Sequence, residues 1–131
     1  MLIPATRYSD CEGALAFLKK VIGMEELAVH RDEAGVIQHV EMKMGDSLFM
    51  FGPEAETPFA RYMTAPRDTG GRETTTMYVI VKDVETHNAK AMAAGATIIL
   101  PLEERPHGGL QYSLRDPEGH VWTIGTYDPR G

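Results

Sequence analysis

The segment that decides the fold lies near the C-terminus and reads Leu114-Arg115-Asp116-Pro117-Glu118-Gly119-His120-Val121-Trp122. Its centre favours a tight turn: Asp116 can bond the backbone two residues on, Pro117 presets φ, and Gly119 tolerates positive φ. The flanking runs 111–114 and 121–124 are β-prone and alternate in character. The sequence therefore predicts a hairpin whose two strands both contact the core.

Composition predicts a single globular domain. The chain has 131 residues, 43% of them hydrophobic and 24% charged, which is ordinary for a soluble protein. A net charge of −6 argues against a nucleic-acid or anionic-membrane partner. Cys11 is the single cysteine, which excludes an intrachain disulfide and a cysteine-based zinc site. No signal peptide and no apolar run of roughly 20 residues is visible, so we expect a cytoplasmic protein without a membrane span.

Outward from the hairpin, the chain divides into two similar halves. Each half is predicted to run strand, helix, strand, strand, strand. Each helix follows an aspartate that can cap its N-terminus and ends at a glycine, with Asp10 and Gly23 in the first half and Asp83 and Gly95 in the second. We predict one domain, 1–131, with repeat one at 2–52, a connector at 53–73 and repeat two at 74–127. The connector is rich in proline and glycine and is predicted to be a linker or a flap without regular elements.

This duplication predicts an α+β fold. One βαβββ unit covers one face of its sheet with its helix and must bury the other against a partner unit. We expect two βαβββ repeats that form a curled mixed sheet around a central cleft, with the helices outside. Clefts between such halves are usual binding sites for small ligands.

The order of elements, the duplication and the segment 116–122 resemble the vicinal oxygen chelate superfamily. That superfamily includes glyoxalase I, extradiol dioxygenases, fosfomycin-resistance enzymes and bleomycin-resistance proteins. The resemblance covers essentially the whole chain. It implies a homodimer whose halves pair within one chain or swap between chains, and the long connector permits either arrangement.

The resemblance also implies where a metal would bind. Metal-dependent members hold a divalent ion with His and Glu side chains on four cavity strands. The corresponding positions here are Ile3, Phe49, Met77 and Thr123, and no neighbour of these residues is a His or a carboxylate. Such side chains are poor ligands for a hard ion. We therefore expect no metal and no cofactor, so that the fold does not imply metal chemistry.

Polar candidates for the cleft come from strand alternation. His39 and Glu41 share one face of the predicted strand 36–44, opposite Val40 and its neighbours. They form an acid/base couple, two ligands of a relocated metal, or simply a solvated polar face. Arg7 also points inward by alternation, where it either binds an anionic ligand or pairs with Glu41.

Apolar candidates complete the predicted ligand-binding set. The expected lining is Phe49, Phe51, Met77, Val79, Val121 and Thr123, while Trp122 and Tyr78 are expected to pack under the helices. The alternative is that these side chains fill the space and leave no pocket. His87, His107 and His120 are predicted to lie at the surface. Cys11, at a helix start, is a weak candidate for a thiol of lowered pKa.

Two functional hypotheses remain open. The first is a metal-free homodimer that binds a small, partly apolar or cationic molecule in the cleft, as bleomycin-resistance proteins do. The second is a lyase or isomerase type enzyme that uses His39 and Glu41, with or without a relocated divalent metal. A third, weaker hypothesis is a regulatory partner with a filled cleft.

Overall fold

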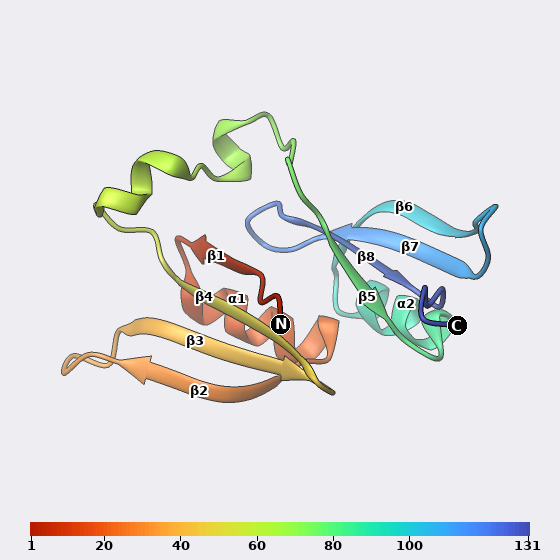
Figure 1. The fold of residues 1–131 in the computed structure, drawn as a ribbon, viewed down its shortest axis with the longest axis horizontal. Coiled ribbons are helices and arrows are strands. Elements are labelled where there is room, and N and C mark those ends of the chain that lie inside the picture. The colour runs from red at the N-terminus through yellow and green to blue at the C-terminus, as the bar shows by residue number, and fades with distance from the viewer.

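The computed structural model describes residues 1–131 as two βαβββ repeats joined by a connector (Figure 1). The first repeat comprises β1 (Ala5–Tyr8), α1 (Cys11–Phe17), η1 (Leu18–Ile22), β2 (Glu25–Arg31), β3 (Ile37–Met44) and β4 (Ser47–Pro53). The connector contains η2 (Pro58–Tyr62) and η3 (Pro66–Asp68). The second repeat comprises β5 (Met77–Ile80), α2 (Val84–Ala93), β6 (Thr97–Glu104), β7 (Leu110–Arg115) and β8 (Val121–Gly125).

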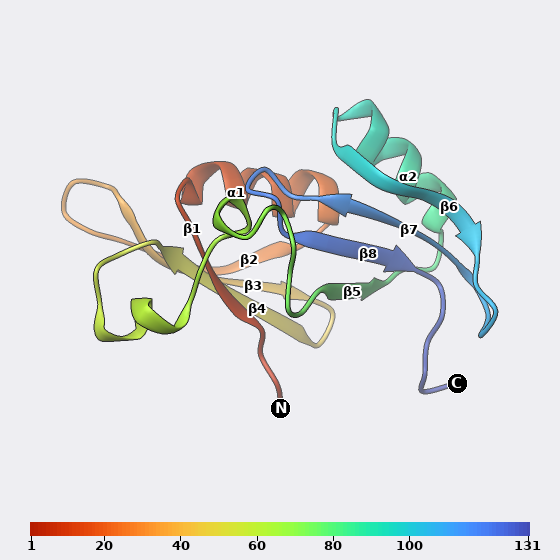
Figure 2. The same ribbon diagram turned by 90° about the horizontal axis from the view of Figure 1, so that it is seen from above.

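The strands form two four-stranded sheets with the same topology. Their orders are β1-β4-β3-β2 and β5-β8-β7-β6. In each sheet the first strand pairs parallel to the last, and the other pairs are antiparallel. Both helices lie on one side of the strands (Figure 2), and none is long and apolar enough to cross a bilayer. The predicted α+β class and repeated unit are confirmed, although the strands form two separate sheets that do not close into one.

The predicted helix caps are present in both repeats. The carboxylate of Asp10 accepts a hydrogen bond from Gly13 N, and that of Asp83 accepts one from Thr86 N, each at 3.0 Å. These bonds satisfy backbone donors that have no partner within the helix. Gly23, directly after η1, has a φ of +96°, which a side chain would strain.

One local prediction is wrong. The connector was expected to contain no regular element but forms the short 3-10 helices η2 and η3. In the second repeat, β6 runs through Pro101 to Glu104. Because β6 is an edge strand and its pairing with β7 shifts register between Leu100 and Glu103, a residue without an N–H donor is tolerated there.

The strand faces differ from the prediction in the first repeat. Residues paired across an antiparallel ladder share a face. Phe51 pairs with Val40 and Phe49 with Met42, and all four are buried on the side that the helix covers. We expected the two phenylalanines to point into the cleft, away from the helix. The structure places both on the helix side instead. The error arises because strand alternation shows which residues share a face but not which face the helix covers.

The same correction applies to β5. Met77 pairs with Trp122 and Val79 with Ile124, so both lie on the helix side. Tyr78 instead shares the open face with Thr123; it is 42% exposed, and its hydroxyl donates to the carbonyl of Tyr127 at 2.8 Å. Tyr78 is therefore not a core residue.

One continuous core joins the two repeats. Trp122, which was expected in the core, is 2% exposed. Its ring meets that of Phe49 edge to face at 5.3 Å, across the boundary between the sheets. Each such large apolar side chain stabilises the fold by about 1.5–3 kcal/mol when buried. The two repeats therefore share one hydrophobic core.

Candidate functional site

The turn that follows β7 connects the two repeats through Asp116. This carboxylate is 5% exposed, and its Oδ2 accepts hydrogen bonds from the hydroxyl of Tyr8 (2.6 Å) and the indole N–H of Trp122 (3.2 Å). Its Oδ1 accepts from the backbone N–H groups of Glu118 and His120, both at 3.0 Å. Four donors offset the cost of burying the charge. Burial, and then the charge of Asp116, raise the pKa of Tyr8 far above its ordinary value, so the hydroxyl keeps its proton.

Glu118 makes a second connection between the repeats. Its carboxylate accepts hydrogen bonds from Ser9 N at 2.7 Å, Ser9 Oγ at 2.9 Å and Asp10 N at 2.8 Å. The turn of the second repeat therefore binds the backbone where α1 begins. Negative charge is favourable at this end of a helix.

His120 attaches the end of the connector to the same turn. Its Nδ1 lies 2.9 Å from Oε1 of Glu73, whose Oε2 accepts from Val121 N at 3.1 Å. The two side chains are 16% and 13% exposed. The imidazole also lies edge to face with Tyr8, with ring centres 5.4 Å apart. The prediction that His120 is a surface residue is wrong.

His87 is likewise not a plain surface residue. Its Nε2 lies 3.0 Å from the carbonyl of Ile22, which only accepts, so Nε2 carries the proton. Nδ1 then accepts from the hydroxyl of Tyr112. The imidazole therefore joins α2 to the end of η1 in the other repeat.

A cavity of about 860 Å³ lies at the junction of the two repeats, next to this turn. It is bordered by β1, β4, the end of the connector and the start of β5. Its apolar lining includes Ile3, Tyr8, Phe49, Met63, Met77 and Trp122. Its polar lining consists mainly of threonines, among them Thr64, Thr74, Thr75 and Thr76. Glu73 and His120 are the lining residues with a carboxylate or an imidazole, and no lysine or arginine contributes to the wall.

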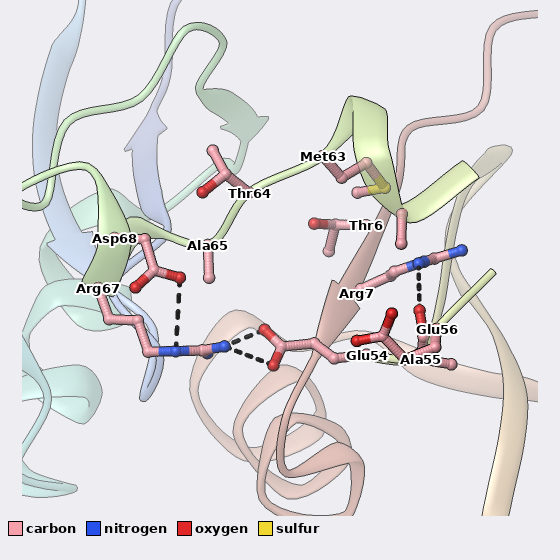
Figure 3. Close-up of a pocket in the computed structure, with 11 residues that line it drawn as sticks. Thr6, Arg7, Glu54, Ala55, Glu56, Met63, Thr64, Ala65, Arg67 and Asp68 are labelled. Carbon is pink, nitrogen blue, oxygen red and sulfur yellow. Dashed lines mark hydrogen bonds and ion pairs between the residues drawn. The ribbon is translucent and has the colours of Figure 1, made fainter. Parts of the chain in front are cut away.

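A smaller, polar pocket of about 440 Å³ adjoins the junction cavity and shares Thr6, Met63 and Thr64 with it (Figure 3). In this pocket Arg67 holds the carboxylate of Glu54 through two bonds of 2.8 and 2.6 Å. Such paired bonds fix the geometry of both side chains. The pocket is therefore bounded by an ion pair within the connector region.

Arg7 also lies at this smaller pocket (Figure 3). Its Nη1 donates to the carbonyl of Ala55 at 3.2 Å, and its Nη2 donates to Thr57 Oγ1 at 2.9 Å. The expected pairing of Arg7 with Glu41 is wrong. The connector, which folds back along β1, supplies the partners instead.

His39 and Glu41 are adjacent, as strand alternation predicted, but they do not line either cavity. Nε2 of His39 lies 3.2 Å from Oε2 of Glu41, and their side chains are 40% and 36% exposed. The pair lies on the open face of the first sheet. The pair is far from the junction because β4 lies between β3, which carries the pair, and β1, which borders the junction cavity.

The apolar candidates separate into two groups. Phe49 and Met77 line the junction cavity because it opens where the helix-side faces of the two sheets meet. Phe51 and Val79 belong to the core and contribute to neither cavity. Val121 and Thr123 also lie outside both cavities, with Thr123 Oγ1 at 2.7 Å from Ser113 Oγ.

Sequence reasoning missed Glu73, His120 and the threonines at 74–76. The useful signals were the position of His120 directly after the turn and the unusual Thr74-Thr75-Thr76 run before β5. Cys11 is 8% exposed, and burial raises the pKa of its thiol to about 11, with Glu118 adding to the effect. This shift is opposite to the lowered pKa that was considered for a thiol at this helix start.

The fold of two βαβββ repeats around a junction cavity defines a class of small proteins that use one duplicated scaffold. Residues 4–124 match the family model described as Glyoxalase/Bleomycin resistance protein/Dioxygenase superfamily, and the chain belongs to that superfamily. An uncharacterized protein of Mycobacterium tuberculosis strain H37Rv is 26% identical over 124 residues, which cover 95% of this chain and 72% of the relative.

Solved structures agree with this assignment. TioX from Micromonospora sp. ML1 is 30% identical, covers 95% of this chain and 94% of its own, and has a TM-score of 0.74. Lactoylglutathione lyase from Agrobacterium tumefaciens is 21% identical over 95% of this chain and 91% of its own, with a TM-score of 0.67. A mutant of the fosfomycin resistance protein FosX from Listeria monocytogenes is 13% identical over 98% of this chain and 89% of its own, with a TM-score of 0.71. The last two likenesses show the fold alone.

The four positions that the resemblance gave for a divalent ion, Ile3, Phe49, Met77 and Thr123, carry no His or carboxylate. The structure does not bring these four together, because Met77 and Thr123 lie on opposite faces of the second sheet. No group of three or more His, Cys, Asp or Glu side chains in this structure is arranged to hold a metal ion. Glu73 and His120 bind each other instead of converging with a third ligand.

Proposed function

We propose that this protein binds a small organic molecule in the junction cavity and does so without a metal ion. The observation that carries the proposal is the cavity itself, at about 860 Å³. Pockets for small ligands have volumes of roughly 300–1,000 Å³ and combine apolar walls with a few polar groups. The junction cavity has that size and that composition.

The wall chemistry supports a neutral or cationic ligand. The FosX structure holds Mn(II) and 1S,2S-dihydroxypropylphosphonic acid, and a phosphonate needs cationic partners. The junction cavity has no lysine or arginine in its wall, and Glu73 contributes a carboxylate. The net charge of −6 also disfavours an anionic ligand. An aromatic or aliphatic molecule with few charges is therefore the best match.

The methionines provide a direct test of where a ligand binds. The chain has eight, and Met63 and Met77 line the cavity whereas Met92 is exposed on α2. In methyl-labelled protein, a library of neutral and cationic aromatic compounds is screened by NMR. A cavity ligand shifts the methyl signals of Met63 and Met77 and leaves that of Met92 in place. The proposal would be refuted if no compound of the library shifted the methyl signal of Met63 or Met77.

A cavity-filling substitution provides the second arm of the test. Thr76 is exposed and lines the cavity, so Thr76→Trp is expected to occupy the space without disturbing the core. Binding of a hit from the screen should weaken at least tenfold. The matched control is Thr97→Trp, an exposed threonine at the start of β6 that lies outside the cavity, which should leave binding unchanged.

A lyase or isomerase reaction at His39 and Glu41 is the second candidate function. Its support is the 3.2 Å contact between these side chains, which suits a proton-transfer pair. His39→Ala and Glu41→Ala distinguish the two functions. Loss of a measured turnover with the fold intact would favour the enzyme. Unchanged binding in the junction cavity would favour the binding protein.

We also propose that the protein is a homodimer. The open face of the second sheet carries exposed apolar side chains, with Tyr78, Ile80 and Leu100 at 42%, 39% and 50% exposure. A second copy would cover such a surface. Native mass spectrometry at low micromolar concentration tests this, because a purely monomeric spectrum would contradict it.

A further inference from the structure

His120 presents an open ring nitrogen beside the junction cavity. Its imidazole forms part of the cavity wall and is largely buried, and its Nδ1 is bonded to Glu73. Its other nitrogen, Nε2, has no hydrogen-bond partner in the protein and is not among the solvent-inaccessible polar atoms that lack one. Nε2 is therefore accessible while the rest of the side chain is held in place.

The partners of Glu73 determine which nitrogen carries the proton. An ionised carboxylate only accepts, and Glu73 accepts both from the N–H of Val121 and from Nδ1 of His120. Nδ1 must therefore be the protonated nitrogen of the neutral imidazole. The lone pair of Nε2 is left free to accept a hydrogen bond.

The surroundings favour an uncharged donor at Nε2. The imidazole contacts the carboxylate of Glu73 from the connector and the ring of Tyr8 from β1, while Asp116 of the turn accepts from the backbone N–H of His120. Arg115 is directed to the carbonyl of Gly119 and is not part of the cavity wall. Tyr8 and Trp122 add aromatic surface to the wall. An anionic group in the cavity would meet the carboxylate of Glu73 and no lysine or arginine.

We propose that Nε2 of His120 is the hydrogen-bond acceptor that anchors the ligand in the junction cavity. The ligand class is a neutral aromatic molecule that presents an N–H or O–H donor. Glu73 is the positioning residue, because it fixes the ring and its tautomer. This assignment rests on the proposed function, since it concerns a ligand in the same cavity.

The test uses a pair of probes, indole and 1-methylindole, in which a methyl group replaces the hydrogen of the N–H donor. Binding to the full-length protein is followed by NMR at pH 8, with the Met77 methyl reporting occupancy and the ring ¹⁵N signals of His120 reporting the anchor. We expect indole to bind about 3- to 10-fold more tightly, the usual value of one neutral hydrogen bond. We also expect indole, and not 1-methylindole, to move the Nε2 signal.

The possible outcomes separate this inference from the proposed function. If both probes shift Met77 equally and neither moves Nε2, the cavity binds ligands but His120 is not the anchor. If neither probe shifts Met77 at millimolar concentration, the inference fails, and the wider compound screen decides the proposed function.

Two variants and one control complete the test. His120→Asn keeps an N–H donor near Glu73 but removes the ring nitrogen Nε2, so the preference for indole should vanish while the melting temperature stays close to that of the native protein. Glu73→Gln should weaken the preference because the tautomer is no longer fixed by a charge. The matched control is His107→Asn. The imidazole of His107 meets the ring of Tyr127 edge to face outside the cavity, so this substitution should leave the preference intact.

The pH profile distinguishes an anchor from a purely structural histidine. Once the imidazole takes up a second proton, Nε2 donates a hydrogen bond instead of accepting one. The preference for indole over 1-methylindole should therefore fall as the pH drops from 8 to 5, while the affinity for 1-methylindole stays constant. A preference that is independent of pH would overturn the assignment.

Discussion

Tyr8 and Asp116 lie 108 residues apart in the chain, and a buried hydrogen bond of 2.6 Å joins them across the two repeats. Asp116 belongs to the turn that dominates the sequence pattern, and Tyr8 ends the first strand. The turn is thus a connection between the repeats as well as a local structure. His120, which directly follows the turn, forms part of the wall of the junction cavity.

Removing the Tyr8 hydroxyl should weaken this connection. Tyr8→Phe deletes one of four hydrogen bonds to the Asp116 carboxylate, and hydrogen bonds to charged groups contribute about 1.5–3 kcal/mol. We expect the free energy of unfolding in urea to fall by about that amount. The control is Tyr127→Phe, a partly exposed tyrosine whose loss of hydroxyl should change stability by less than about 0.5 kcal/mol. Equal effects would contradict the role given to Tyr8.

Glu118 should contribute to stability through the start of α1. Glu118→Ala leaves Ser9 N, Ser9 Oγ and Asp10 N without their acceptor. We expect a loss of about 1–3 kcal/mol in urea unfolding, with faster hydrogen exchange at the start of α1. Glu56→Ala is the control, since Glu56 is exposed and forms no ion pair. Unaltered exchange at Ser9 and Asp10 would rule out the proposed connection.

Cys11 should react slowly with alkylating reagents. Burial raises the pKa of its thiol to about 11, so only about one thiol in a thousand is ionised at pH 8. Iodoacetamide should therefore modify the folded protein about two orders of magnitude more slowly than the protein unfolded in urea, where the pKa is about 8.5. Intact mass spectrometry follows the reaction. Similar rates in both states would show that the thiol is exposed.

Folding stability should decline at alkaline pH because of Tyr112. Burial raises its pKa to about 12, against about 10 in the unfolded chain. The folded state therefore holds its proton longer, so the stabilising contribution is complete below pH 10 and is lost as the pH rises towards 12. Urea unfolding between pH 8 and 11.5 should show a shallower decline for Tyr112→Phe. Tyr8 acts in the same direction, so part of the decline should remain in that variant.

Local signals explain why much of the fold was predictable. Asp10 and Asp83 cap helices through bonds to residues three positions ahead, and Gly23 ends the first helical segment with positive φ. The turn at 116–119 likewise depends on side chains that bond their own neighbouring backbone. Because these interactions span only a few residues, a single sequence displays them.

The site was less predictable because its parts meet only in three dimensions. Phe49, Phe51, Met77 and Val79 were placed on the wrong face, since alternation groups residues by face without showing which face the helices cover. His120 and Glu73 are 47 residues apart, and neither has a spacing that predicts their contact.

The sequence by itself determined the duplicated βαβββ pattern, the helix caps and the turn, because each depends on neighbouring residues. Only the tertiary structure decided which side chains line the cavity between the repeats, where Glu73 and His120 contribute and His39 and Glu41 do not. The physical reason is the packing of two sheets against their helices into one core, which brings Phe49 to Trp122 and Tyr8 to Asp116. Those contacts join distant parts of the chain, and their geometry depends on the whole fold.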